Sequence, residues 1–370
     1  MPDTLTQRAL NRATLDRQLL LRRHPMPARQ AVAHLAGLQA QAPLAPYTGL
    51  WTRLETFKPE NLSSLISERA VLRAHLMRNT IHLVTTQDYV DSGPLFTQLR
   101  ARGLQASFGK RLPGLDFTEV RAYAAVVLAG HELTRGQLGK LLAQRWPDAD
   151  ENALAHAATH LLPLVHVPPR GIWGKTGQVT VALAEEWLAE EWLSTPLSAL
   201  PDATDRLVLR YLAAFGPATV NDIQAWSGLT RLREVTERIA GQLRTLSGPG
   251  GEELLDLPGA PRPDPDTPAP PRFLPEYDNL LLSYADRRRV IPHGRPVPLP
   301  PGNGSAQGTL LIDGQWNATW KITQSVLHAV LHIQPFIPLS PAAADAITAE
   351  GAHLLDFAAK SPANHDIRFG

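Results

Sequence analysis

Two glutamines at alternate positions are the side chains of this sequence that point most directly to chemistry. They are Gln39 and Gln41, in the segment HLAGLQAQAPLAPYTGLW (34–51). A proline pushes the residue before it towards extended geometry, so a helix that enters this segment must end before Pro43. In an extended exit the two glutamines point the same way, and Ala40 points towards the packing side. The spacing therefore predicts two converging carboxamides.

Neutral amides are poor bases, so any chemistry at such a pair would be electrostatic or would consist of holding a water molecule. Tyr47 and Trp51 follow closely and are predicted to lie near the same site. The alternative is that these amides cap backbone carbonyls at a helix end, which is the commoner use of such side chains. The residues alone leave both interpretations open.

The charge is distributed unevenly along the chain. The formal net charge of the 370 residues is only +1, but residues 1–112 contain 15 Lys and Arg against 7 Asp and Glu. Local positive charge governs contact with phosphates, so this first part is the candidate DNA-facing region. An arginine-rich, solvated helix surface would produce the same count.

Cysteine is absent from the sequence, which excludes disulfides, thiolate metal sites and cysteine nucleophiles. The polar start MPDTLTQRALNR has no apolar signal region, and no apolar run approaches the roughly 18 residues of a membrane span. We expect a multidomain cytoplasmic protein associated with the nucleoid.

The elements that would position the glutamines follow from periodicity and from proline and glycine. Apolar spacing predicts a helix over 7–23, a second one from Pro27 through Leu38, and a third over 59–67. Residues 69–84 then predict two strands with Arg78-Asn79 near the turn. Helices followed by a two-stranded ribbon are typical of a winged helix-turn-helix.

The same order recurs twice. Asp116 to Glu119 and Thr134 to Gln137 each match a helix-capping box, and a ribbon is predicted over 164–181. Further on, Thr219 is predicted to start a helix that ends near Gly228, and Thr230 a longer one. These patterns indicate tandem units.

The last part differs from these units. The proline-rich stretch 258–273 predicts an extended connector, 308–322 predicts strands with a turn at Asp313-Gly314, and a helix through Leu354 is expected near the end. The predicted fold class is α+β, with three tandem winged helix-turn-helix units and a small β-rich domain. The predicted boundaries are 1–112, 113–199, 200–290 including the connector, and 291–370.

Several segments of the sequence resemble a known family. They are GLQAQAP, LMRNTIHLV, VPPRGIWGKTGQ, RFLPEYDNLLLSYADRRRVI and LLIDGQWNATWKI, which together span nearly the whole chain. They are similar to the AlkZ/YcaQ-like winged-helix DNA glycosylases, and Gln39 and Gln41 match the Gln-x-Gln element of the AlkZ branch. Asn79 departs from the glycine expected in the wing turn.

The resemblance implies that Gln39 and Gln41 are catalytic in a monofunctional DNA glycosylase. The implied substrates are alkylated purines in double-stranded DNA, of the N7-alkylguanine type, with bulky adducts or interstrand crosslinks included. An N7-alkylated purine already carries positive charge and leaves readily, so the glutamines would stabilise an oxocarbenium-like sugar and hold water. The resemblance implies no metal or other cofactor, and we expect a monomer. The alternative is a non-catalytic winged-helix DNA-binding regulator.

Further candidates concern DNA contact and metal binding. Arg170, Trp173 and Lys175 in the 164–181 ribbon are candidate DNA contacts, although an ordinary wing with Trp173 packed inside is equally compatible. Arg78 and Arg287 are two further candidate contacts, and the run that contains Arg287 could also be a solvated turn. A last pair, His156 and His160, has the spacing of metal ligands but lacks the glutamate of the metalloprotease motif, which favours core or surface histidines.

Overall fold

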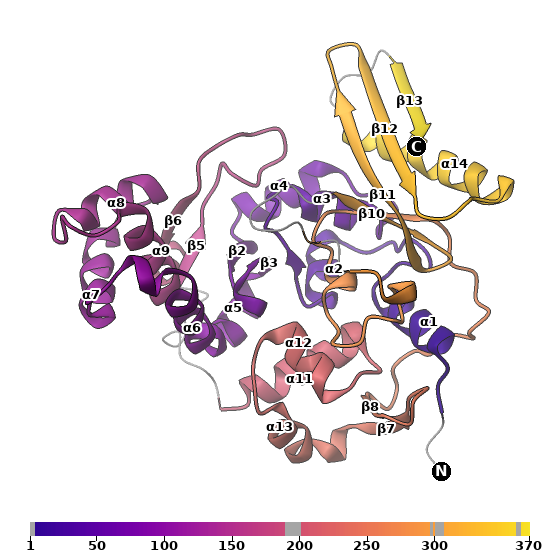
Figure 1. The fold of residues 1–370 in the computed structure, drawn as a ribbon, viewed down its shortest axis with the longest axis horizontal. Helices are drawn as coiled ribbons and strands as arrows, with labels where there is room; N and C mark the ends of the chain where they lie inside the picture. Colours follow the sequence, from indigo (N-terminus) through magenta and orange to yellow (C-terminus); the bar gives the residue numbers. More distant parts are fainter. Residues whose placement is uncertain (1–3, 189–200, 297–298, 300–306, 360–363) are drawn as a thin grey trace.

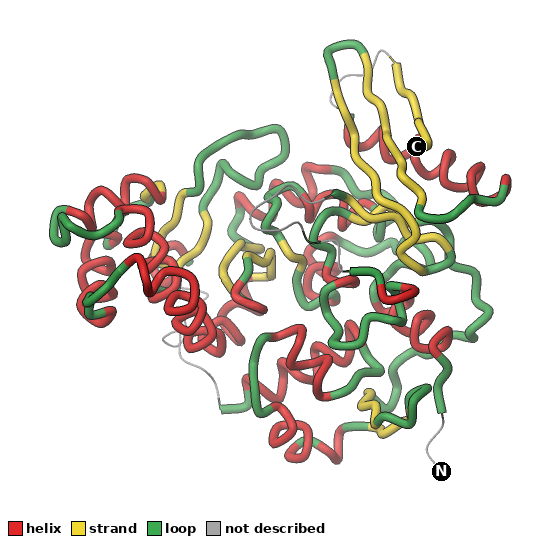
Figure 2. The backbone as a smooth tube through the Cα atoms, viewed as in Figure 1, coloured by secondary structure: helices red, strands yellow, loops and turns green. Residues whose placement is uncertain are grey.

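Helices and strands alternate along the computed structural model, which describes residues 4–188, 201–296, 299, 307–359 and 364–370 (Figure 1). Figure 2 shows one group of helices at the left, around the ribbon of the second predicted unit, and the longest strands at the upper right. Among the described helices, none is long and apolar enough to cross a membrane.

The first part of the chain consists of short helices around a tight hairpin. In chain order the elements are α1 (Gln7–Arg17), α2 (Ala28–His34), β1 (Leu38–Gln39), α3 (Ala45–Trp51), α4 (Pro59–Ser67), β2 (Val71–His75), η1 (Met77–Asn79), β3 (Ile81–Thr85), α5 (Thr86–Ser92), η2 (Gly93–Phe96), α6 (Thr97–Phe108) and η3 (Gly109–Arg111).

The second part is a helical group with a second hairpin, and the third has helices before short strands. The second contains α7 (Phe117–Leu128), β4 (Leu133–Thr134), α8 (Arg135–Ala143), α9 (Glu151–Leu161), β5 (Leu164–His166), β6 (Thr180–Leu183) and α10 (Ala184–Trp187). The third contains α11 (Ala203–Phe215), α12 (Val220–Ser227), α13 (Leu232–Arg238), η5 (Ala240–Gln242), β7 (Arg244–Ser247), β8 (Glu253–Asp256), β9 (Arg272–Leu274), η6 (Asn279–Leu281) and η7 (Pro292–Gly294).

The last part is a sheet with one long helix. Its elements are β10 (Gly308–Ile312), β11 (Gln315–Gln324), β12 (His328–Pro335), α14 (Pro341–Ala358) and β13 (Asn364–Phe369). The five-stranded sheet has the order β13-β12-β11-β10-β9, so the connector ends in a strand of this sheet. The expected turn between β10 and β11 is confirmed, with positive φ at both Asp313 and Gly314.

The two hairpins that precede residue 184 form one sheet of order β1-β3-β2-β5-β6-β4. They join where β2 pairs with β5 in antiparallel register, with Arg73 opposite His166. The turn of the first hairpin is where the sequence predicts it, and both Arg78 and Asn79 have positive φ. This conformation explains why glycine suits position 79, and asparagine is among the side chains that tolerate it best.

The local capping signals are confirmed at Thr134 and Thr219. Asp116 does cap α7, but it accepts the backbone N–H of Thr118 (2.8 Å), so the predicted box with Glu119 is wrong. The Thr134 hydroxyl accepts the backbone N–H of Gln137 (3.2 Å), while the Gln137 side chain accepts the N–H of Thr134 (2.9 Å). Thr219 caps α12, which ends at Gly228 with φ of 77°. Such bonds involve neighbours within one turn, so a short stretch of sequence determines them.

Three predicted element ends are wrong. The first helix stops at Arg17 instead of residue 23, because Leu19 has a positive φ of 58° and cannot continue a helix. Thr230 does not cap α13, whose N-cap is Arg231, itself left-handed. The helix that ends at Leu38 in the prediction ends at His34, and Leu38 lies in β1.

The hydrophobic cores cross the predicted unit boundaries. One cluster joins Leu76 and Met77 of the first hairpin region to Tyr211, Phe215 and Trp226 of the α11–α12 region. A second joins the first helices to the C-terminal sheet and α14, while a third lies among α6–α9 and the strands β5 and β6. The division at residues 112, 199 and 290 stays a prediction.

Candidate active site

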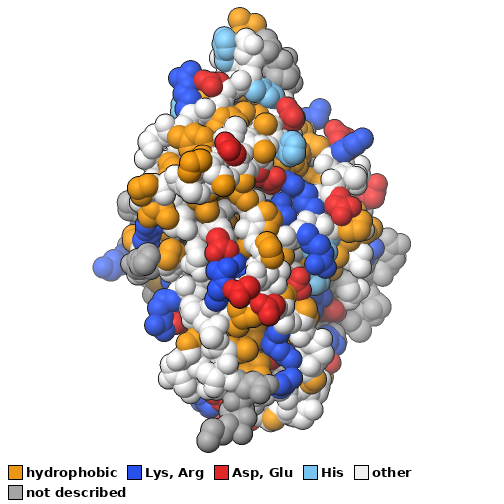
Figure 3. Space-filling model, turned by 90° about the vertical axis from the view of Figure 1, so that its right-hand side faces the viewer, with side chains coloured by type: hydrophobic (Ala, Val, Ile, Leu, Met, Phe, Trp, Pro, Cys, Tyr) orange, Lys and Arg blue, Asp and Glu red, His pale blue; other side chains and the backbone are white. Residues whose placement is uncertain are grey.

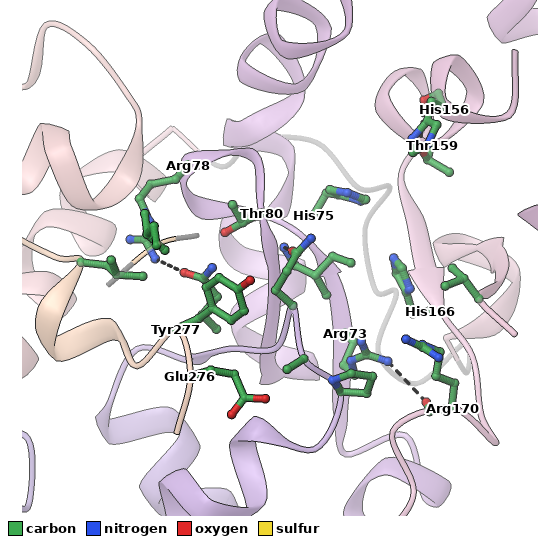
Figure 4. Close-up of a pocket in the computed structure, with 18 of the residues that line it drawn as sticks. Arg73, His75, Arg78, Thr80, His156, Thr159, His166, Arg170, Glu276 and Tyr277 are labelled. Atoms are coloured by element: carbon green, nitrogen blue, oxygen red, sulfur yellow. Dashed lines mark hydrogen bonds between the residues drawn. The ribbon is translucent and has the colours of Figure 1, made fainter. Parts of the chain in front are cut away.

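A cavity of about 910 Å³ lies where the two hairpins meet the chain segment after β9. Figure 4 shows its residues coming from three directions, with Arg78 and Tyr277 on one side and His156, His166 and Arg170 on the other. Its described lining residues are Gln39, Gln41, Ala42, Pro43, Arg73, His75, Arg78, Thr80, Ile81, Arg135, Asn152, His156, Thr159, His166, Arg170, Val179, Glu276, Tyr277, Leu282, Arg287 and Leu299.

Both predicted glutamines line this cavity. Gln39 is the last residue of β1 and is 7% exposed, whereas Gln41 is exposed. Ala40 between them is fully buried and donates its backbone N–H to the Ile81 carbonyl (2.7 Å). The alternation predicted for this exit is therefore present.

The two amides are held differently. The Gln39 carbonyl oxygen accepts a hydrogen bond from an Arg78 Nη2 at 2.7 Å. Because a guanidinium offers only donors, the oxygen of Gln39 must face Arg78, and its NH₂ group takes the other direction. The Gln41 oxygen accepts a longer bond of 3.3 Å from the backbone N–H of Ile81.

Arg78 binds three parts of the chain at once. Besides Gln39, its guanidinium donates to the Asn279 side-chain oxygen (2.8 Å) and to the Trp226 carbonyl (2.9 Å). Burial lowers the pKa of Arg78 to about 10. Although predicted to contact DNA, Arg78 is thus engaged inside the protein and fixes the Gln39 amide.

Arg73 ties the two hairpins to the glutamine segment. It is 3% exposed and donates to the carbonyl oxygens of Ala40 (3.0 Å) and Arg170 (3.4 Å), as Figure 4 shows for the second. Its Nε has no partner within the described part of the chain, and burial lowers its pKa to about 10. This cation holds the backbone between the two glutamines.

Histidines also line the cavity. The ring of His75 lies 5.5 Å from that of His160 and 5.7 Å from that of His166, centroid to centroid. Burial lowers the pKa of His75 to about 3 and that of His156 to about 4. His156 stacks on Phe108 at 4.4 Å, as expected for a packed histidine. Among the described residues, no group of three or more His, Asp or Glu side chains is arranged to hold a metal ion.

Tyr47 and Trp51 do not belong to the described lining of the cavity. The Tyr47 hydroxyl donates to the Gly171 carbonyl (2.8 Å) and accepts the backbone N–H of Trp173 (3.1 Å). Trp51 stacks on Phe357 at 5.6 Å. Both rings therefore position the second hairpin and α14 from behind the site.

The three predicted DNA contacts of the second hairpin lie in different surroundings. Arg170 lines the cavity and donates to the Gly177 carbonyl at 3.1 Å, and Lys175 is exposed. Trp173 packs between Tyr47 (5.0 Å) and Phe357 (5.4 Å), which is the packed alternative for this ring.

The three consecutive arginines after η6, Arg287 to Arg289, also lie in different surroundings. Arg287 lines the cavity, and its Nε has no partner among the described residues. Arg288 pairs with Asp286 on the surface. Arg289 is buried over the Tyr284 ring and donates to the Pro217 carbonyl (2.8 Å). Only Arg287 of the three faces the site.

The segment Glu276 to Asn279 was missed as part of the site. Its Glu276 and Tyr277 line the cavity, and Asn279 shares Arg78 with Gln39. Burial raises the pKa of the Glu276 carboxyl. The sequence did contain a signal for this part of the site, namely the run Pro-Glu-Tyr-Asp-Asn just after a strand. Polar residues at the ends of buried strands are common in functional sites.

Part of the positive charge of residues 1–112 is engaged in ion pairs within the protein. Arg8 and Arg12 pair with Asp313, Arg17 with Asp256, Arg23 with Glu350, and Arg53 with Asp278. On the face in Figure 3, Lys and Arg are interspersed with Asp and Glu. These pairs engage five arginines of residues 1–112 within the protein, and the assignment of this region as the DNA-facing part stays a prediction.

The fold is that of a solved DNA glycosylase. Over 99% of this chain and 100% of the other, the structure superimposes on the Streptomyces sahachiroi DNA glycosylase AlkZ with a TM-score of 0.75 and 19% sequence identity. The model of the family "DNA glycosylase AlkZ-like" matches residues 32–357, and the chain belongs to this family.

A curated relative supports the same assignment. Over 257 residues the chain is 25% identical to the "Interstrand DNA cross-link repair glycosylase" of Streptomyces sahachiroi. The match covers 66% of this chain and 64% of the length of that protein. The resemblance noted from the sequence is thereby confirmed at the level of the family.

Proposed function

We propose that this protein is a monofunctional DNA glycosylase that hydrolyses the N-glycosidic bond of alkylated purines of the N7-alkylguanine type in double-stranded DNA. The observation that carries the proposal is the convergence of Gln39 and Gln41 on one cavity lined by arginines. A non-catalytic DNA-binding protein has no need of a buried amide fixed by a guanidinium at the base of such a cavity.

The chemistry follows from what the two amides offer. As the bond to a cationic purine breaks, positive charge develops on the sugar, and a preorganised carbonyl oxygen stabilises it. Gln41 is better placed for this task, because the oxygen of Gln39 already faces the positive charge of Arg78. Within the described residues the NH₂ group of Gln39 has no acceptor, so it can hold a water molecule or a phosphate oxygen.

The size and charge of the cavity fit a bulky substrate. Pockets for small ligands usually measure about 300–1,000 Å³, and this cavity of about 910 Å³ is near the upper end. Arg135, Arg170 and Arg287 line the cavity and supply positive charge for phosphates of the damaged strand. We therefore extend the proposed substrates to bulky N7 adducts and to interstrand crosslinks, the lesion in the name of the curated relative.

The test is incubation with a duplex that contains one N7-methylguanine, followed by alkaline cleavage at any abasic site. We expect a cleaved strand only after alkali, and none with the unmodified duplex. Repetition with a bulky N7 adduct and with a crosslinked duplex defines the range. Tight binding to all these duplexes without an abasic product would favour the alternative of a non-catalytic DNA-binding protein.

A further inference from the structure

The segment that follows β9 is fixed against the strand that carries Gln39. Asp278 forms a buried ion pair with Arg53 through two bonds of 3.0 Å. Asn279 donates to the Gly37 carbonyl (3.2 Å) and accepts from Arg78. These bonds set the position of the preceding residues relative to Gln39.

This anchoring places Glu276 in the cavity. Tyr277, with a positive φ of 63°, separates Glu276 from the anchored Asp278, and Figure 4 shows Glu276 and Tyr277 together on the side of Arg78. Glu276 supplies the one carboxyl group among the described lining residues. The same cavity contains Gln39 and Gln41.

The Glu276 carboxylate has no structural task within the described part of the chain. Apart from its own backbone N–H, no described residue gives it a hydrogen bond or an ion pair. By contrast, the buried or half-buried acids Asp256, Asp278 and Glu350 are each paired with an arginine. A half-buried carboxyl without a partner is costly and is characteristic of functional sites.

We propose that Glu276 accepts the proton of the water molecule that attacks the sugar, an inference that rests on the proposed function. In this step the water oxygen bonds to C1′ while the bond from C1′ to the purine nitrogen breaks. The electron pair of that bond goes to the cationic purine, which leaves neutral, and the water proton goes to Glu276. Neither glutamine can accept this proton at neutral pH.

Among the described lining residues, Glu276 is the group from which we expect a pH dependence of the rate between pH 5 and pH 8. Burial lowers the pKa of His75 to about 3 and that of His156 to about 4, and it also holds the pKa of His166 well below the ordinary value of a histidine. Tyr277 has a raised pKa, again through burial. The remaining charged groups are arginines, namely Arg73, Arg78, Arg135, Arg170 and Arg287. Because burial raises the pKa of Glu276, the rate should fall as acid protonates it.

The test is single-turnover excision of N7-methylguanine between pH 5 and pH 8 by the wild type, Glu276→Gln and Glu276→Asp. The exposed Glu55 offers a matched control, Glu55→Gln, which removes the same charge outside the cavity. We expect Glu276→Gln to be about 100-fold slower, with no loss of rate towards acid. Glu276→Asp should retain the pH dependence, and Glu55→Gln should behave as wild type. Sodium azide, a nucleophile that needs no proton removed, should partly restore Glu276→Gln.

The outcomes separate this inference from the proposed function. A wild-type rate in Glu276→Gln overturns the inference alone. So does a slow Glu276→Gln that keeps the wild-type pH dependence and does not respond to azide, because that result describes a structural role. A wild-type protein that excises no base overturns the proposed function, and the inference with it.

Discussion

The two hairpins that form the central sheet are built alike but end differently. The β2–β3 hairpin closes in a tight turn at Arg78 and Asn79. The charged side chain of Arg78 points into the protein and binds Gln39. The β5–β6 hairpin leaves residues 167–179 between its strands, and Lys175 there is exposed. Their shared pairing through β2 and β5 places the cavity at the junction.

The difference separates positioning from contact. The short hairpin fixes Gln39 through a network of three acceptors on Arg78, so a change there should affect both folding and chemistry. The long hairpin rests on Tyr47 through Trp173 and can offer Arg170 and Lys175 to a ligand. Changes there should affect substrate binding and leave the fold intact.

Arg78→Ala should have the largest effect of any change in either hairpin. It leaves three acceptors without their donor, and each such loss costs about 1–3 kcal/mol. We expect the free energy of unfolding to drop by about 4 kcal/mol, and excision to fall further than in a Gln39 variant. Urea unfolding and single-turnover assays measure both. Arg102→Ala, at an exposed arginine, is the control; equal stability of the two variants would contradict the role of Arg78.

Gln39→Ala and Gln41→Ala should each slow excision about 100-fold, equivalent to about 3 kcal/mol of barrier. Gln41 is exposed, so its variant should keep the wild-type stability, whereas Gln39→Ala should lose some because Arg78 loses an acceptor. Excision and thermal melting of both variants decide this. Wild-type excision rates would refute the assignment of the pair.

The histidines of the short hairpin should make stability depend on pH. Burial lowers the pKa of both His75 and His82 to about 3. Below pH 6.5 these two histidines therefore bind protons in the unfolded chain but stay neutral in the native state. Stability is therefore complete above that pH and is lost on acidification. From pH 7 to pH 5 we expect a loss of about 2 kcal/mol from the fully buried His82 and less from His75.

Urea unfolding at the two pH values measures this loss. His75→Gln should make the difference between them smaller, since a glutamine binds no proton in either state. The same difference in His75→Gln as in the wild type would mean that His75 is not held neutral by the fold.

The double variant Arg170→Ala, Lys175→Ala on the long hairpin should have the smallest effect. We expect about tenfold slower excision of bulky N7 adducts, roughly the effect of losing one or two phosphate contacts. N7-methylguanine, whose removal depends mainly on its own leaving ability, should suffer less. Single-turnover rates on both substrates test this. Equal losses would indicate general phosphate binding, and no loss would leave the loop as a structural wing.

The sequence by itself determined the features that depend on near neighbours. Three such features were predictable, because each depends on bonds or side-chain directions within a few residues. They are the capping box of Thr134 and Gln137, the turn at Asp313 and Gly314, and the alternation of Gln39 and Gln41 about a buried Ala40. The family resemblance, which rests on longer segments, could also be recognised from the sequence.

Only the tertiary structure decided which charged side chains are left for a ligand. Arg17 binds Asp256, which lies 239 positions further along the chain, and Arg78 binds Asn279, which lies 201 positions further. No local sequence pattern predicts either partner. The placement of Glu276 in the cavity depends likewise on Asp278 and Asn279 binding distant residues. The physical reason is that a charge is neutralised by whatever the folded chain brings within a few ångströms, which the order of residues does not specify.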